Sequence, residues 1–139
     1  MGYLDEGDPR WAADSGGEGH WEKPEWGAAD GPAAAALLAE TAEQSRLILE
    51  YLVRHPGLEV HCTELVDAVM GGPNASNPAN RVAGALAGMG KAHAASGRRL
   101  PFYWWAAPEG STGATYAVKP SVAAVFLAAL LEQARHARG

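Results

Sequence analysis

The stretch NPANRVAGALAGMGKAHAA, residues 77–95, decides the fold that we predict for the chain. Asn77 followed by Pro78 is a typical helix start, because asparagine caps free backbone N–H groups and proline fits the first helical position. Buried-type side chains then recur at the i, i+4, i+7 and i+11 spacing of one stripe: Val82, Leu86, Met89 and His93. This spacing predicts a helix over 77–95 whose other face carries Arg81, Gly84, Gly88 and Lys91.

Residues 101–118 follow this helix and have the pattern of a β-hairpin. The segments 102–105 and 115–118 are rich in aromatic and β-branched side chains, which favour strands, and 108–113 between them is rich in turn residues. A different use of the aromatic residues Tyr103 to Trp105 would be a stacking platform for single-stranded nucleic acid. Because neighbouring side chains in a strand point to opposite faces, about half of them would be buried, and we favour a core role.

Helical patterns also precede residue 77. They begin with the alanine-rich stretch after Pro32 and resume at Thr41, whose spacing to Gln44 is that of a capping box. The segment 44–54 then places apolar residues at helical intervals. His55-Pro56-Gly57 ends this first core helix, because the residue before a proline disfavours helical backbone.

The remaining elements complete the order. Residues 58–62 predict a short strand, and Thr63 is placed to cap a two-turn helix that Gly71-Gly72-Pro73 ends. Pro120 opens a last helix to about Arg138, with a wide apolar face. The winged-helix order is helix, short strand, helix, turn, helix and hairpin, and the predicted elements follow it. We therefore predict an α+β fold: a winged helix-turn-helix with an extra C-terminal helix.

Three parts of the chain are predicted. Residues 1–31 form an irregular acidic arm, which Trp11, Trp21 and Trp26 attach to the body. The alternative is a flexible acidic tail in which the tryptophans have no structural role. Residues 32–119 form the winged-helix domain. Residues 120–139 form the C-terminal helix, which supplies part of a homodimer contact or, as the alternative, simply packs on its own core.

The net charge of −5 is divided unevenly along the chain. Residues 1–43 hold ten acidic and two basic residues, whereas residues 44–139 hold six acidic and nine basic ones. The span 68–108 has no acidic residue and carries Arg81, Lys91, Arg98 and Arg99. Because screening limits attraction to about 8–10 Å at physiological salt, this local excess of positive charge matters more for a DNA partner than the total does.

The N-terminal end of the 77–95 helix would read base edges in the major groove. The residues expected there are Ser76, Asn77, Asn80 and Arg81. Asparagine can bond adenine and arginine can bond guanine through two hydrogen bonds each. The alternative is that Asn77 only caps the helix and contacts no base.

Phosphate contacts are expected beside this end. They would come from Lys91, Arg98 and Arg99, and from Ser111 and Thr112 in the hairpin loop, where Glu109 opposes them. The alternative is that these basic residues form an ordinary solvent-exposed face and bind nothing. Gly84 and Gly88 each cost about 1 kcal/mol relative to alanine in a helix, so each needs close approach, either to a phosphate backbone or to another protein element.

Other classes of protein have little support. The sequence shows no nucleophile with a base, no paired carboxylates and no phosphate-binding glycine loop, so we expect no enzyme. The lone Cys62 and the scattered histidines have no metal-ligand spacing, and strand alternation would point Cys62 away from His61. The apolar stretch 122–131 is about half the roughly 20 residues of a membrane span, and residues 1–10 are acidic, so we expect a cytoplasmic protein without metal or cofactor.

Five motifs together resemble a family of small, largely uncharacterised winged-helix proteins from actinobacteria. They are the start Asp8-Pro9-Arg10-Trp11, then His55-Pro56-Gly57, then RVAGALAGMG at 81–90, GRRLPFYWW at 97–105, and Thr115-Tyr116. The resemblance covers nearly the whole chain, and the 97–105 motif is its most specific part. It implies the winged-helix fold and a DNA-binding or regulatory role, but no defined ligand, target sequence or catalytic residue.

We therefore expect a homodimeric DNA-binding protein of the nucleoid, a transcriptional regulator or an architectural factor, which uses the helix 77–95 and the hairpin 101–118 on double-stranded DNA. The alternative is a winged-helix module that binds a protein, adaptor-like or antitoxin-like, and no nucleic acid. The acidic arm would either compete with DNA for the basic residues or dock a protein partner.

Overall fold

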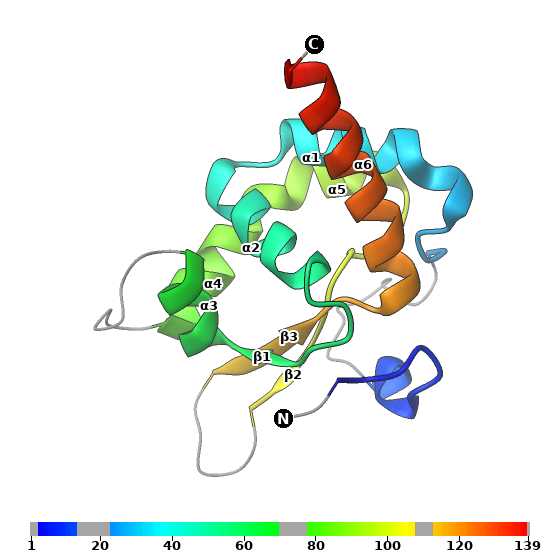
Figure 1. Cartoon of the computed structure of the whole chain (residues 1–139). Helices are drawn as coiled ribbons and strands as arrows, with labels where there is room; N and C mark the ends of the chain where they lie inside the picture. The colour runs from blue at the N-terminus through cyan, green and yellow to red at the C-terminus, as the bar shows by residue number, and fades with distance from the viewer. Residues whose placement is uncertain (1–2, 14–22, 70–77, 108–112, 139) are drawn as a thin grey trace.

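The structure is a computed structural model that describes residues 3–13, 23–69, 78–107 and 113–138. Within these residues it has six α-helices and a small three-stranded antiparallel sheet, which confirms the α+β class (Figure 1). The helices are α1 (Gly31–Glu40), α2 (Glu43–Val53), α3 (Cys62–Val69), α4 (Pro78–Leu86), α5 (Gly90–Ser96) and α6 (Pro120–Arg138). The strands are β1 (Val60–His61), β2 (Tyr103–Ala106) and β3 (Ala114–Ala117).

The sheet has the order β1-β3-β2, so the hairpin strand β3 lies in the middle. Tyr116 of β3 pairs with Val60 on one side and with Trp104 on the other. The helices lie over one face of this sheet, and residues 3–13 lie at its other side (Figure 1). The single bridge between Tyr3 and Leu58 joins that segment to the chain just before β1.

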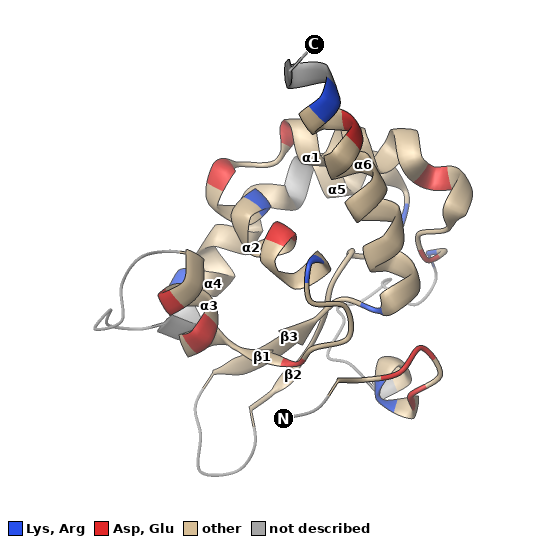
Figure 2. Ribbon diagram, in the orientation of Figure 1, with Lys and Arg blue, Asp and Glu red and all other residues tan. Residues whose placement is uncertain are grey.

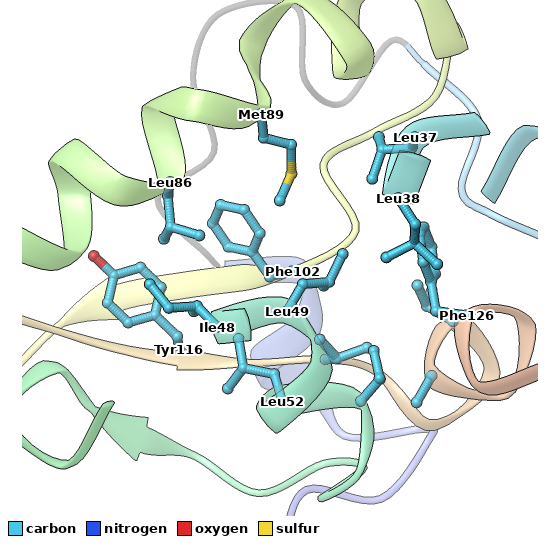
Figure 3. Close-up of a cluster of buried hydrophobic side chains, with 14 of the residues drawn as sticks. Leu37, Leu38, Ile48, Leu49, Leu52, Leu86, Met89, Phe102, Tyr116 and Phe126 are labelled. Atoms are coloured by element: carbon cyan, nitrogen blue, oxygen red, sulfur yellow. The ribbon is translucent and has the colours of Figure 1, made fainter. Parts of the chain in front are cut away.

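Two hydrophobic clusters cover the two faces of the sheet. The main cluster joins α1, α2, α4 and α6 to Phe102 and Tyr116 (Figure 3). The second cluster consists of Leu4, Trp11, Tyr103, Trp105 and Ala117. The alternation of side chains in β2 explains this division, since Tyr103 and Trp105 point to the face opposite that of Trp104.

The N-terminal segment is attached through its tryptophans, as predicted. Trp11 is 4% exposed and Trp26 is 3% exposed, while Trp21 lies outside the described residues. Trp26 belongs to the main cluster and packs edge-on against Phe126, with ring centroids 4.8 Å apart. Residues 23–30 therefore contribute to the same core as the helices. Two short 3₁₀ helices, Pro9–Ala13 and Ala28–Asp30, are the regular structure described in this segment.

The predicted capping box at Thr41 is wrong. Thr41 ends α1 instead, because its Oγ1 donates a hydrogen bond of 2.6 Å to the carbonyl oxygen of Leu37. The N-cap of α2 is Ala42, which makes no side-chain cap bond. The hydroxyl of Thr41 was free to bond either neighbouring helix, and the last turn of α1 left carbonyl groups without helical partners.

The helix predicted over 77–95 is interrupted, and Asn77 lies outside the described residues. A 3₁₀ turn over Ala87–Met89 separates α4 from α5. The start of α2 packs against this turn: Ser45 Oγ donates to the carbonyl oxygen of Ala85, and Ala42 N donates to that of Gly88. Because these donors take carbonyl groups from the helical ladder, the helix tightens at this point.

The last helix, α6, buries one face on the chain's own core. Val122, Ala123, Phe126 and Ala129 are each at most 5% exposed. This packing is the alternative that the sequence left open for α6, and it uses only one side of the helix. Over the described residues, no helix is both long and apolar enough to cross a lipid bilayer.

Candidate nucleic-acid interface

The outward face of α4 is the first part of the candidate interface. Val82 and Leu86 are buried, Arg81 is half-buried, and Ala83 and Gly84 are exposed. A Cβ atom built on Gly84 meets nothing within 4 Å, so packing inside the chain does not require glycine there. A Cβ on Gly88 would lie 2.8 Å from Cβ of Ala42, so close packing on α2 explains this second glycine.

Several predicted residues lie where their side chains are not described. Asn80 is in the first turn of α4 and Lys91 is in α5. Ser76, Asn77, Ser111 and Thr112 lie outside the described residues.

Arg98 lies in an ion pair with the N-terminal segment. Its Nη2 is 2.9 Å from Oδ1 of Asp30, and its Nε is 3.1 Å from Oδ2. The same carboxylate accepts the backbone N–H of Gly27 at 2.8 Å. The hydrogen bonds from Arg98 and then from Gly27 hold the pKa of Asp30 below its ordinary value, and Asp30 in turn raises the pKa of Arg98.

Arg99 contacts the same segment through its side chain and its backbone. Its Nε donates to the carbonyl oxygen of Lys23 at 2.8 Å, and its backbone N–H donates to that of Pro24 at 3.0 Å. The indole N–H of Trp26 donates to the carbonyl oxygen of Arg99 at 2.7 Å. Both arginines that the sequence assigned to phosphates therefore hold residues 23–30 against the body.

Arg81 and the pair Arg98 and Arg99 are not brought together. The helical stretch α4, 3₁₀ turn and α5 runs between them, which is roughly 20 Å of helical backbone. Figure 1 shows α4 beside α3 and α5 below α1. Lys and Arg are distributed over several elements in Figure 2.

The aromatic hairpin is covered by the chain itself. The rings of Trp11 and Tyr103 meet edge to face with centroids 4.9 Å apart, and those of Trp11 and Trp105 are 5.7 Å apart. Arg10 lies 4.6 Å from the ring centroid of Trp105. Tyr103 and Trp105 are 2% and 6% exposed, so neither offers a face on which a base could stack.

Arg10 also joins the N-terminal segment to the sheet, a contact that the sequence did not reveal. Its guanidinium forms a two-point pair with Glu59 at 2.5 and 2.8 Å, and Glu59 accepts the hydroxyl of Thr115 at 2.7 Å. The hydrogen bond from Arg10 is the main cause that lowers the pKa of Glu59, and burial opposes it.

A second polar group surrounds a hollow of about 350 Å³ between the N-terminal segment and β2. Tyr103 donates its hydroxyl to Glu25, and Lys119 Nζ lies 3.2 and 3.3 Å from the two Glu25 oxygens. Burial acts to raise the pKa of Glu25, but the bonds from Tyr103 and Lys119 outweigh it and the pKa is lowered. Burial and then Glu25 raise the pKa of Tyr103. The three residues are too far apart in sequence for any motif to have linked them.

Cys62 and His61 do touch, contrary to the expectation from strand alternation. Cys62 Sγ lies 3.7 Å from His61 Nδ1, because α3 begins at Cys62 and turns the chain there. The thiol is buried, with 1% of Cys62 exposed, and the same nitrogen accepts the backbone N–H of Thr63 at 3.1 Å. Across the described residues, no group of three or more metal-ligating side chains gathers.

The geometry defines an α+β protein whose helical body and N-terminal segment enclose a three-stranded sheet. The family of unknown function DUF6416 matches residues 31–133, and the chain belongs to this family. The match extends from α1 into α6, and the segment before α1 lies outside it. Comparisons with curated proteins and with solved structures give no match.

Proposed function

We propose that this protein is a winged-helix DNA-binding protein, a transcriptional regulator or nucleoid factor, in which α4 enters the major groove and the β2–β3 hairpin is the wing. The order α2, β1, α3, α4, β2, β3 and the sheet order β1-β3-β2 support the fold assignment. In this assignment α3 and α4 form the helix-turn-helix, and the N-terminal half of α4 faces the bases.

The open face of α4 is the observation that carries the proposal. Gly84 is exposed and has no neighbour that excludes a side chain, although glycine costs about 1 kcal/mol in a helix interior. Positions 80 and 81 precede Gly84 by about one turn and share its face. A smooth surface beside an arginine allows a phosphate backbone to approach closely.

The contacts inside the chain change which residues the proposal depends on. Arg81 becomes the central contact, with Asn80, Lys91, Ser76 and Asn77 on the same stretch of chain, and with Ser111 and Thr112 from the hairpin loop. Arg98 and Arg99 reach DNA only when residues 23–30 release them. The ion pair of Asp30 with Arg98 supports the hypothesis that the acidic segment competes with DNA for these groups.

A protein-binding module is the second candidate, and the charge of α3 favours it. Glu64 and Asp67 are exposed on this helix, which packs beside α4 (Figure 2). Carboxylates there repel phosphates, and the whole chain carries a net charge of −5. Under this reading Gly84 admits the close approach of a partner helix, and the chain acts as an adaptor-like or antitoxin-like partner.

The deciding experiment is a fluorescence-anisotropy titration of the full chain against a mixed-sequence duplex at several salt concentrations. The proposal expects binding that weakens steeply with salt, and the R81Q variant should reduce the salt slope by about 0.9. The matched control is R54Q, since Arg54 is equally charged and lies at the exposed end of α2. Absence of binding at low salt, or equal losses in the two variants, would reject DNA binding through α4.

A further inference from the structure

The outward side of α6 is exposed in the described part of the chain. Most of its exposed residues follow one strip along the helix: Ser121, Ala124, Ala128, Leu131, Glu132 and Arg135, with the exposed Ala134 beside it. Leu131 is 63% exposed, and of the described residues only it and Tyr3 are exposed large hydrophobic residues. An amphipathic surface helix normally presents polar side chains on this side, whereas Ala124, Ala128 and Leu131 make the middle of this strip apolar.

A hollow of about 440 Å³ lies directly beside this strip. One wall comes from α6, and the other comes from the segment that leads into α1. The lining consists of Trp26, Gly27, Ala28, Gly31, Ser121, Ala124, Val125 and Ala128. Most of these side chains are small, which leaves apolar space that the described residues do not fill.

We propose that a second copy of this chain binds here, with the two α6 helices antiparallel about a two-fold axis near Ala128. In such an interface each surface meets its own copy. Pairing position 128 with position 128 places Leu131 opposite position 125 of the second copy. The exposed Leu131 of each copy then enters the hollow of the other, so that one helix supplies both the protruding side chain and the space that receives it.

Charge supports the choice of a second copy. The same register places position 135 opposite position 121. Glu6 lies at Ser121, where its two oxygens accept the backbone N–H at 2.8 Å and the hydroxyl at 2.7 Å. Glu6 is half exposed and lies 3.8 Å from Lys119, and the exposed Arg135 forms an ion pair with Glu132 of its own helix. In this register the Glu132–Arg135 pair of each copy lies opposite the Glu6–Lys119 pair of the other, at both ends of the interface. Charge pairs at a rim mainly select partner and register.

The test measures the molar mass of the full chain by light scattering, without DNA, over a range of about a hundredfold in protein concentration. We expect a dimer that dissociates on dilution. The variant A128E should be a monomer at every concentration. The control A94E makes the same change at an exposed position of α5 and should leave the dimer intact. A wild-type monomer throughout, or a dimer unaffected by A128E, overturns the proposal.

The register has its own test. The variant A128C should form a disulfide-linked dimer under mild oxidation, whereas A94C should not; the native Cys62 is buried and does not interfere. The variants E6K and R135E should each raise the dissociation constant about 2-fold to 5-fold, and the double variant should restore it. Cross-linking of A94C equal to that of A128C, or no restoration in the double variant, overturns the antiparallel register. Because no step involves DNA, the result is independent of the proposed function.

Discussion

Asp30 and Arg98 are 68 residues apart in sequence and form a two-point ion pair, with N–O distances of 2.9 and 3.1 Å. The pair closes the N-terminal segment over the turn that follows α5. The sequence pattern associates Arg98 with phosphate binding, but in the structure Arg98 holds the chain's own acidic segment.

The substitution D30N tests this relationship. The neutral amide keeps one acceptor oxygen but loses the ion pair with Arg98, so phosphate competes better for the guanidinium. If the proposed function holds, the salt slope of DNA binding should increase by about 0.9. The measurement is the anisotropy titration described above. The control E40Q makes the same charge change at the exposed end of α1. An identical slope in D30N and wild type would mean that Arg98 takes no part in binding.

Alanine substitutions at Gly84 and at Gly88 should change the free energy of unfolding in opposite directions. Alanine at Gly88 would place Cβ 2.8 Å from Ala42 Cβ and 2.9 Å from Ser45 Oγ, so G88A should lower the free energy of unfolding by about 1–3 kcal/mol. G84A meets open space and should raise it by up to about 1 kcal/mol. Urea unfolding of the two variants compares them directly. If DNA approaches α4 closely, G84A should also weaken binding despite its greater stability.

Trp26 should be essential to the main core. It is 3% exposed, packs on Phe126 and donates a hydrogen bond to the carbonyl oxygen of Arg99. Removal of the ring leaves a cavity and an unpaired carbonyl group, so W26A should cost about 3–5 kcal/mol. W26F retains most of the apolar volume and should cost clearly less. A loss below about 1 kcal/mol in W26A would show that residues 23–30 are not part of the cooperative unit.

Acid should weaken the fold through Glu59. Its pKa in the folded chain lies below the ordinary value of 4.5, chiefly because Arg10 donates hydrogen bonds to it. A carboxylate with a lowered folded pKa stabilises fully above the unfolded pKa and loses that contribution as pH falls through the folded pKa. The free energy of unfolding should therefore fall as the pH drops below about 4.5.

The variant E59Q isolates this contribution. It should be less stable than wild type at neutral pH, and the difference should shrink as the pH falls, since protonation removes the same charge from the wild type. Urea unfolding between neutral and acid pH measures both curves, with E64Q on the exposed side of α3 as the control. Parallel curves for wild type and E59Q would contradict the prediction.

The elements themselves could be predicted from the sequence with useful accuracy. The helix predicted over 44–54 is observed at 43–53, and the hairpin predicted over 101–118 contains both observed hairpin strands. Val82, Leu86 and Met89 of the predicted stripe are buried as the helical spacing indicates, whereas its fourth member, His93, is half-buried. These features depend on periodicity and turn residues within a few positions of each other, and that information is present in any short stretch of sequence.

The candidate site was less accessible to such reasoning. Residue type alone placed Arg81, Arg98 and Arg99 in one basic group, yet only the folded chain shows that the last two bind residues 23–30. The interruption of the 77–95 helix likewise comes from Ala42 and Ser45, which no local pattern connects to Ala85 and Gly88.

Sequence by itself thus determined the helix at 44–54, the hairpin, the order of elements and the attachment of the N-terminal segment by tryptophan, but not the break between α4 and α5. Tertiary structure alone decided which cations are paired, which glycine is packed and which side of α6 stays open. The physical reason is range: helical periodicity and capping act over a few residues. An ion pair such as Asp30 with Arg98, or a contact such as Gly88 with Ala42, depends on which distant segments meet when the core closes.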